Sequence, residues 1–216
     1  MTDVKPSASL ATLIGDVVRS RNAADRSGLH DLLTGVLAEA NTRLRPAVPL
    51  RVTVGDEFQG CFATVGEALH ASLWLRLHLA PTQVRHGIGW GAVVVLADQP
   101  RVEDGPGWWA AREAIDAVKT EAAKAGTRQR RTAYRRADPT DGPDPGPVNA
   151  ALMCRDHMIG SVSERSVRLL RGAVDRRSQA ELAEDEGISA SAVSQRMRND
   201  GLGVILAADE LLTGVS

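Results

Sequence analysis

The spacing of apolar residues over the first fifty positions predicts a strand followed by a helix. Residues 9–18 are small or β-branched and apolar almost without interruption, which is typical of a strand buried on both faces. Asp16 falls at or near the end of this strand. Over residues 26–45, apolar side chains recur every three or four positions, which predicts an amphipathic helix that Pro46 ends.

The next apolar segments predict a hairpin and a second helix. Residues 50–54 alternate as a strand does, a Gly-Asp turn follows, and residues 59–64 can return as the second arm. Such a turn presents Asp56 and Glu57 at one end of the hairpin. Helical spacing then resumes over residues 65–79.

Residues 84–96 contain three glycines and then an aliphatic run, and we interpret them as one strand. A further helix is expected over 108–125, with Gly126 as its C-terminal stop. Strands and helices alternate in this order without strict βαβ repeats. We therefore expect an α+β fold, a βαββαβ sheet with helices on one face, followed by a small all-α part.

The composition changes after residue 126. Five arginines fall within 128–136 without an acidic residue, and a proline-rich stretch follows, which is typical of a loop or linker. Helical periodicity resumes over 148–158 and 162–174. The predicted parts are a sheet domain over 1–126, an Arg- and Pro-rich linker over 127–150 and a helical domain over 151–216.

Two short helices joined by a tight turn are predicted near the C-terminus. Ser178 is a good N-cap with Glu181 at the capping-box position, and a second helix covers 190–198. The pattern resembles the helix-turn-helix of sigma-factor region 4, in which small polar residues, glutamine and arginine contact bases or phosphates. The candidate DNA-binding residues are Ser191, Ser194, Gln195, Arg196 and Arg198.

A helical hairpin used for dimerisation or protein contact is the alternative. Residues 161–216 contain seven arginines, no lysine and nine acidic residues, a net charge of −2, and the whole chain carries −1. Neither value provides a general attraction to nucleic acid. DNA binding at physiological salt would need a dimer or help from the arginines of 128–136, which can equally be a solvated linker face.

The overall composition is that of a globular protein, with 43% hydrophobic and 25% charged residues. Cys61 and Cys154 lack metal-like spacing and no signal peptide is recognisable, so we expect reduced thiols and a cytoplasmic location. The longest apolar run, 92–97, is far shorter than the roughly twenty residues needed to cross a bilayer. We expect no membrane role.

Two acidic motifs in the N-terminal half carry the clearest candidate chemistry. Asp16 in Ile-Gly-Asp and Asp56 in Val-Gly-Asp-Glu-Phe each follow a glycine near a predicted strand end. Carboxylates on neighbouring strands can share Mg²⁺, which usually binds through one or two carboxylates together with substrate phosphates. The alternative is that each aspartate is a turn or cap residue.

Four stretches occur in the same order as in the class III nucleotidyl cyclase and diguanylate cyclase superfamily. Residues 14–18 resemble the first metal-binding strand, and 54–58 resemble the diguanylate cyclase hairpin motif in four of five positions. Residues 84–91 are similar to the cyclase strand with Arg, Gly-Ile and a later Gly, and 105–112 resemble the start of the next helix. The whole chain resembles the SatD family, whose members pair such a domain with a C-terminal helix-turn-helix.

The resemblance implies a cyclase-like or palm-like sheet and a role for specific residues. Asp16 and Asp56 would bind Mg²⁺ or Mn²⁺, with Glu57 as a possible third carboxylate. Arg112 would meet phosphate or transition-state charge as a planar donor. Where class III cyclases have an asparagine four residues before that arginine, this chain has Trp108, which offers one donor and more bulk.

Other residues near these motifs have two interpretations each. Arg19 and Arg21 would contact a polyphosphate if the metal site is real, and otherwise form a solvated basic turn. His86 is expected to be a half-buried structural residue rather than a ligand. Trp108 and Trp109 are expected to be core or interface residues rather than platforms for a base.

The combined pattern predicts a DNA-binding regulator whose cyclase-like domain senses a nucleotide with its metal. We expect a homodimer, because cyclase-like sites form across a two-fold interface. One alternative is an active nucleotidyl cyclase or nucleotidyl transferase that acts on nucleoside triphosphates. Another is a degenerate N-terminal domain that serves only for dimerisation.

Overall fold

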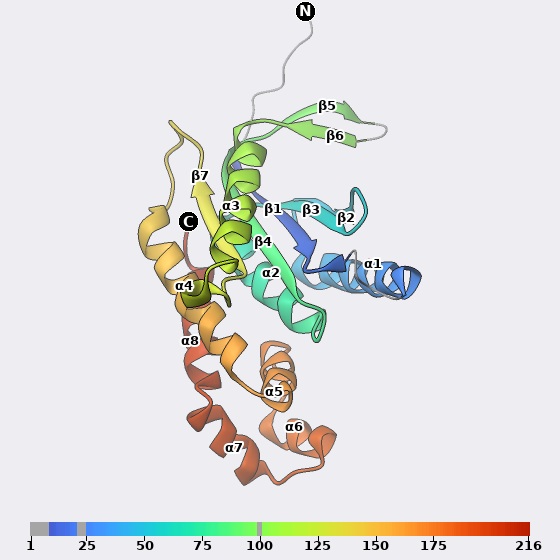
Figure 1. Ribbon diagram of the computed structural model, residues 1–216, viewed down its shortest axis with the longest axis vertical. Coiled ribbons are helices and arrows are strands. Elements are labelled where there is room, and N and C mark those ends of the chain that lie inside the picture. The colour runs from blue at the N-terminus through green and yellow to red at the C-terminus, as the bar shows by residue number, and fades with distance from the viewer. Residues whose placement is uncertain (1–8, 21–24, 99–100) are drawn as a thin grey trace, which may run out of the picture.

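The computed structural model describes residues 9–20, 25–98 and 101–216 and is built around a five-stranded sheet (Figure 1). The strands are β1 (Ser9–Val17), β2 (Val48–Val52), β3 (Glu57–Phe62), β4 (Val84–Ala92) and β7 (Thr132–Arg136). Their order is β2-β3-β1-β4-β7, with β4 and β7 parallel and the other neighbours antiparallel. The first strand of the chain is therefore central.

The central strand β1 pairs with β3 on one side and, along its full length, with β4 on the other. Ala11 and Leu13 point into the main hydrophobic cluster, whereas Ile14 packs in a second cluster on the opposite face. Both faces of β1 are thus buried, which confirms the strand predicted over 9–18. Asp16 lies at the end of this strand, as predicted.

One face of the sheet is covered by α1 (Arg26–Leu44) and α2 (Val65–His78) (Figure 1). Each helix begins at a side chain that accepts a hydrogen bond from the first turn, Asp25 for α1 and Thr64 for α2. Phe58 of β3 lies in the same cluster as residues of both helices. The two helices predicted for this part of the chain are confirmed.

The opposite face is covered by α3 (Pro106–Ala122). A Cβ on Gly87 would lie 2.3 Å from the carbonyl oxygen of Ala111, and one on Gly89 would lie 2.1 Å from that of Gly107. Because only glycine permits this approach, α3 packs directly on the backbone of β4. The expectation of helices on one face is therefore wrong, because glycines that leave no hydrophobic pattern form the second interface.

The segment predicted as one strand over 84–96 is divided into two elements. β4 ends at Ala92, and β5 (Val94–Asp98) pairs antiparallel with β6 (Arg101–Asp104) in a separate two-stranded ribbon (Figure 1). The aliphatic run continues through the break, so the hydrophobic pattern hides it. The helix predicted over 108–125 is α3, which begins and ends earlier.

The segment predicted as a linker over 127–150 contains β7. This strand follows α3 and the short 3₁₀ turn η2 (Ala125–Thr127), and it adds a parallel neighbour to β4. Thr132 and Tyr134 are fully buried. The expectation of an irregular linker does not hold for this strand, because its few buried positions stand between arginines and give too short a pattern to reveal it.

Five helices follow the sheet. They are α4 (Pro145–Ser161), α5 (Glu164–Val174), α6 (Gln179–Glu186), α7 (Ala190–Asn199) and α8 (Leu202–Thr213). The helical periodicity of 148–158 and 162–174 is confirmed by α4 and α5. The predicted capping box joins Ser178 and Glu181, and Ser189 caps α7. None of the described helices is long and apolar enough to cross a membrane.

The C-terminal helices share a hydrophobic core with α2. Leu73 and Leu77 of α2 belong to one buried cluster with Ile159 of α4 and residues of α5 to α8. The backbone N–H of Gly66 donates to the carbonyl of Val215 at 2.8 Å. The two parts of the chain are packed together, and a separate helix-turn-helix domain stays a prediction.

Asp156 of α4 is fully buried where α4, α2 and β7 meet. Its carboxylate accepts hydrogen bonds from the N–H groups of Arg131 and Thr132, both at 2.7 Å, and from the guanidinium of Arg76 at 2.5 Å. Burial lowers the pKa of Arg76 to about 10, and the attraction to Asp156 opposes this shift. The buried cation therefore depends on this carboxylate.

We predict that Asp156→Ala lowers the free energy of unfolding by about 3–5 kcal/mol, because it leaves the Arg76 guanidinium buried without its counter-ion. Urea unfolding followed by circular dichroism measures this difference. His157→Ala, at the next and exposed position of α4, is the matched control and should change stability by less than about 1 kcal/mol. Equal effects of the two substitutions would show that Asp156 does not hold this junction.

Candidate functional site

Asp16 lies opposite Glu57 of β3 and Arg85 of β4 in the sheet register. Its Oδ2 is 3.0 Å from Nζ of Lys119 on α3 and 3.5 Å from a guanidinium nitrogen of Arg85. Its Oδ1 is buried and has no hydrogen-bond partner among the described residues. Because an unpartnered buried carboxylate oxygen is costly, this atom indicates a place for a further cation or donor.

The turn between β2 and β3 brings Asp56 to the same end of β1. Gly55 in this turn has a φ of 67°, in the left-handed region that favours glycine. The Oδ2 of Asp56 accepts a hydrogen bond from the N–H of Val17, the residue after Asp16, at 3.2 Å. The structure therefore brings together the two aspartates that the sequence singled out.

Glu57 is engaged by a different partner. The guanidinium of Arg112 donates to both of its carboxylate oxygens, at 2.7 and 2.6 Å. These hydrogen bonds raise the pKa of Arg112 above its ordinary value. In the part of the chain that the structure describes, no three His, Cys, Asp or Glu side chains are grouped to hold a metal ion. The expected set of three carboxylates is therefore not assembled.

The pair of Asp16 and Asp56 fits a hard divalent cation. Mg²⁺ takes oxygen ligands and commonly uses one or two protein carboxylates together with phosphate oxygens. The Oδ1 of Asp16 is such an oxygen, and the carboxylate of Asp56 lies at the N–H of the next residue, Val17. A cation held there would neutralise charge on the phosphates of a bound nucleotide.

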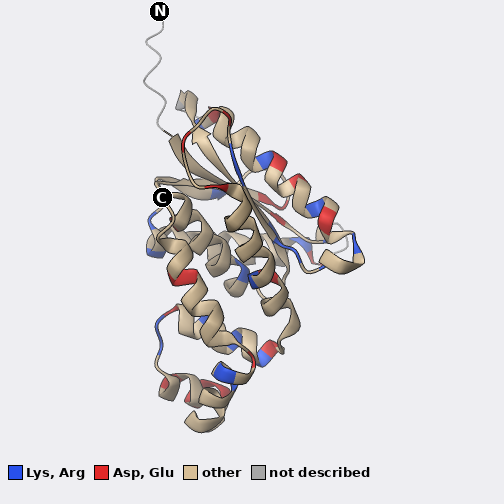
Figure 2. Ribbon diagram, turned by 90° about the vertical axis from the view of Figure 1, so that its left-hand side faces the viewer, with Lys and Arg blue, Asp and Glu red and all other residues tan. Residues whose placement is uncertain are grey.

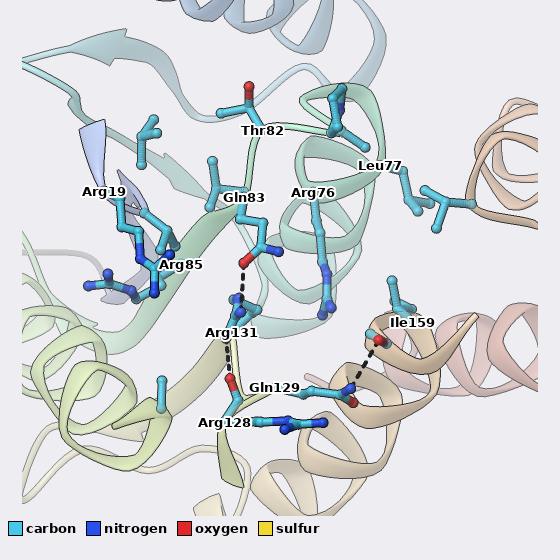
Figure 3. A pocket seen from close by; sticks show the side chains of 18 of the residues that line it. Arg19, Arg76, Leu77, Thr82, Gln83, Arg85, Arg128, Gln129, Arg131 and Ile159 are labelled. Carbon is cyan, nitrogen blue, oxygen red and sulfur yellow. Dashed lines mark hydrogen bonds between the residues drawn. The ribbon is translucent and has the colours of Figure 1, made fainter. Parts of the chain in front are cut away.

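A cleft with a cavity volume of about 1130 Å³ opens at this end of the sheet. Eight of its lining side chains are Lys or Arg, and Glu164 is the one acidic residue among its lining residues. Figure 3 shows Arg19, Arg85 and Arg131 along this cleft. Figure 2 shows charges of both signs over the rest of the ribbon, so the positive excess in the cleft is local.

Of the two arginines predicted to contact phosphate, Arg19 belongs to the described residues and Arg21 does not. Arg19 is exposed, has a φ of 61° and lines the cleft next to the end of β1. Arg21 lies outside the described residues, so its phosphate contact stays a prediction.

The tryptophan pair at the start of α3 has one buried and one exposed member. Trp108 is 7% exposed and packs in the cluster with Ile14 and Ile115. Trp109 is 58% exposed and its indole N–H donates to Asp104 at 2.8 Å. Trp108 is thus a core residue, as expected, and it does not replace the asparagine of class III cyclases as a polar group of the site.

His86 is fully buried rather than half-buried. Its ring meets Phe58 edge-on, with 5.9 Å between the ring centroids, and neither ring nitrogen has a hydrogen-bond partner among the described residues. Burial, together with the nearby cations Arg155 and Arg76, lowers the pKa of His86 to about 3. The imidazole is therefore a neutral structural group.

The predicted DNA-binding residues lie on α7, and none of them lines the cleft. Ser191, Gln195 and Arg198 are exposed. The guanidinium of Arg198 donates to the hydroxyl of Ser194 at 2.7 Å, and that of Arg196 to Ser166 of α5 at 3.3 Å. Arg196 therefore lies partly against α5.

Sequence reasoning missed Lys119 and most of the cleft. Lys119 follows Arg112 by two helical turns, so the two lie on one face of α3, and this spacing was the available signal. No comparable signal links Arg128 with Arg171, because they reach one cleft only through the packing of α5 beside the end of the sheet.

The model of the SatD family matches residues 10–213, and the chain belongs to the SatD family. No curated protein matches the sequence significantly.

Several solved structures of nucleotidyl cyclases are similar to this chain at low identity. A bacterial light-regulated adenylyl cyclase is 11% identical with a TM-score of 0.46, and the alignment covers 59% of this chain and 43% of that one. The guanylyl cyclase domain of the RhoGC fusion protein from the fungus Blastocladiella emersonii is 15% identical with a TM-score of 0.45, over 53% of this chain and 78% of that one. The adenylyl cyclase CyaB from P. aeruginosa is 18% identical with a TM-score of 0.39, over 50% and 71%. The chain thus spans less than half the length of the light-regulated enzyme.

We predict that His86 makes stability fall as the pH drops below about 6.5. The unfolded chain binds a proton at this residue near pH 6.5, whereas the folded chain does so only near pH 3. Between these values each pH unit removes about 1.4 kcal/mol through this group. Urea unfolding of wild type and His86→Leu at pH 7.0, 6.0 and 5.0 measures the difference in slope.

The exposed His30 offers the control, because His30→Leu should keep the wild-type pH dependence. If His86→Leu has the same slope as wild type, the buried imidazole is protonated in the folded state and the assignment is wrong.

Proposed function

We propose that this SatD-family protein binds a nucleoside triphosphate with Mg²⁺ or Mn²⁺ at Asp16 and Asp56 and catalyses nucleotidyl transfer or cyclisation. The observation that supports this best is the carboxylate pair at the end of β1, with the buried Oδ1 of Asp16 lacking a partner among the described residues. The basic cleft beside it provides room and positive charge for phosphates.

The neighbouring cations have roles that follow from their positions. Lys119 and Arg85 now neutralise Asp16. With a divalent cation on that carboxylate, both side chains would be available to phosphate oxygens in the cleft. Arg112 is held by Glu57 at the same end of the sheet and, once released, would stabilise charge on a leaving pyrophosphate.

These residues would act mainly by positioning the nucleoside triphosphate and by neutralising the charge of its phosphates. In a cyclisation, the ribose 3′-hydroxyl gives its proton to water and attacks the α-phosphorus, the bond to the bridging oxygen breaks, and pyrophosphate leaves. Asp16 and Asp56 would hold a divalent cation, which would supply charge that stabilises the attacking and leaving oxygens. The homodimer expected from the family resemblance is part of this proposal, since a second copy would complete the site.

The test is a mass-spectrometric assay of the purified protein with each of the four ribonucleoside triphosphates and Mg²⁺ or Mn²⁺. We predict a new product, and a loss of at least about 100-fold in its rate for Asp16→Asn and Asp56→Asn, comparable to the removal of one strong electrostatic contact to the transition state. Glu113→Gln is the matched control, because Glu113 is an exposed carboxylate of α3 that pairs with Arg135, and it should leave the rate within about twofold.

Two other outcomes have definite meanings. Metal-dependent retention of a triphosphate without product would leave a nucleotide sensor and remove the catalytic part of the proposal. Neither binding nor product with any of the four triphosphates would contradict the proposal altogether.

DNA binding by α7 is the second candidate function. The observation in its favour is that Ser191, Gln195 and Arg198 are exposed on a helix that follows α6 after a tight turn. The acidic residues Glu184 to Glu186 at the end of α6 oppose phosphate binding, so a dimer would be needed for useful affinity.

We predict that Arg198→Ala weakens binding to duplex DNA and lowers the slope of log affinity against log salt by about one, as expected for loss of one phosphate contact. Gln195→Ala should instead reduce discrimination between sequences. A fluorescence anisotropy titration at several salt concentrations measures both, with exposed Arg101→Ala on β6 as control. If wild type binds no duplex drawn from its own genome, DNA binding is ruled out.

A further inference from the structure

The cleft at the end of the sheet has walls from both halves of the molecule. One wall comes from the ends of β1 and β4, the end of α3 and residues 128–131, and the other from α2, α4 and α5. Arg168 and Arg171 of α5 line it together with Arg19 and Arg128 from the sheet side. A ligand in this cleft would therefore touch both halves.

Half of the eight basic side chains in the cleft have a carboxylate partner. Asp156 pairs with Arg76, and Asp16 pairs with Arg85 and Lys119. Glu186 pairs with Arg168. The remaining four form no ion pair with a carboxylate of the described residues, and they are Arg19, Arg128, Arg131 and Arg171. The cleft thus contains four positive charges that no carboxylate of the described residues neutralises in an ion pair.

Arg131 shows how this charge is held in place. Its guanidinium donates to the carbonyls of Arg128 and Arg130, both at 2.8 Å, and to the side-chain oxygen of Gln83 at 2.7 Å (Figure 3). All three acceptors are neutral. Burial lowers the pKa of Arg131 from its ordinary value. A fixed, partly desolvated cation with neutral acceptors favours an anionic ligand.

The shape and the apolar lining limit what that ligand can be. The volume of about 1130 Å³ is slightly above the range of about 300–1000 Å³ that is usual for small-molecule sites, so the cleft has room for a nucleotide. Leu77 and Ile159 are buried in the cluster with α5, whereas Val162 and Val167 also line the cleft and are half-buried. In Figure 3, Arg19, Arg85 and Arg131 lie together on the side of the sheet. These two linings fit a compact ligand with several phosphates and a flat apolar group.

We propose that the cleft binds a multiply phosphorylated nucleotide without a metal ion, and that the ligand clamps α5 against the end of the sheet. The phosphates contact Arg19, Arg128, Arg131 and Arg171, and the base lies against Val162 and Val167. Since α5 to α8 share one hydrophobic cluster, a ligand that fixes α5 also restrains α7. The substrate phosphates of the proposed function use the same cleft, so this ligand would compete with the substrate, but its binding does not require a metal ion at Asp16 and Asp56.

The experiment is isothermal titration of the full-length protein in EDTA with inorganic tripolyphosphate, and then with ATP and GTP. We expect Arg128→Gln and Arg171→Gln each to raise Kd for tripolyphosphate at least tenfold. Arg165→Gln is the matched control, because Arg165 also lies on α5 but does not line the cleft, and its Kd should stay within twofold. Tighter binding of ATP or GTP than of tripolyphosphate would identify a nucleotide, whereas equal binding would replace it with inorganic polyphosphate and overturn the nucleotide part.

Amide hydrogen exchange is a second measurement. Non-specific attraction of an anion to the basic cleft would not slow exchange in both of its walls. Bound nucleotide should slow amide exchange in α5 and in residues 125–131 together. Equal weakening by Arg165→Gln and Arg171→Gln, or no slowing in α5, would overturn the proposal. Binding of a single-stranded RNA that ATP does not displace would also overturn the proposal.

Failure of this inference and failure of the proposed function can be told apart. Asp56→Asn should keep metal-free binding of tripolyphosphate and lose only the metal-dependent activity. Asp16→Asn should bind tripolyphosphate more tightly than wild type, because it releases Lys119 and Arg85 from their carboxylate. An unchanged or weaker affinity in Asp16→Asn would show that these two cations do not face the ligand.

Discussion

Asp156 of α4 joins the start of β7 to α2, because its buried carboxylate accepts from the N–H groups of Arg131 and Thr132 and from the guanidinium of Arg76. The adjacent Arg155 is also buried, and it donates to the hydroxyl of Ser72 at 2.9 Å and to the carbonyl of Leu69 at 3.2 Å, both on α2. These contacts position β7 beside β4 and α4 beside α2. The cleft exists because these elements are held at fixed positions.

Acidic and basic side chains lie next to one another at the end of the sheet where β1 ends. The two aspartates lie at the end of β1 and in the adjoining turn, and cations from α3 and β4 lie against one of them. Further arginines continue from this point along the cleft to α5. Carboxylates that can hold a cation and cations that can hold phosphates are thus neighbours, and this arrangement favours a nucleotide as ligand.

The strand ends and helix caps could be predicted from sequence because they depend on local patterns. Asp16 and Asp56 follow glycine at strand ends, and the capping box of α6 is a four-residue signature. The strand β7 and the second helical layer could not be predicted, since one has few buried positions and the other packs on the glycines of β4. The cleft was missed for a related reason, because its arginines come from segments more than a hundred residues apart. The bidentate pair of Glu57 and Arg112 joined two residues that had been given separate roles.

The central claim is that Asp16 and Asp56 hold a divalent cation next to a nucleotide. The most direct measurement is a crystal structure with Mn²⁺ and a non-hydrolysable nucleoside triphosphate, with data collected to locate manganese by its anomalous scattering. We predict an anomalous peak within coordination distance of both carboxylates, with phosphates between that peak and the arginines of the cleft. Manganese bound elsewhere, or a nucleotide bound away from the end of β1, would contradict it.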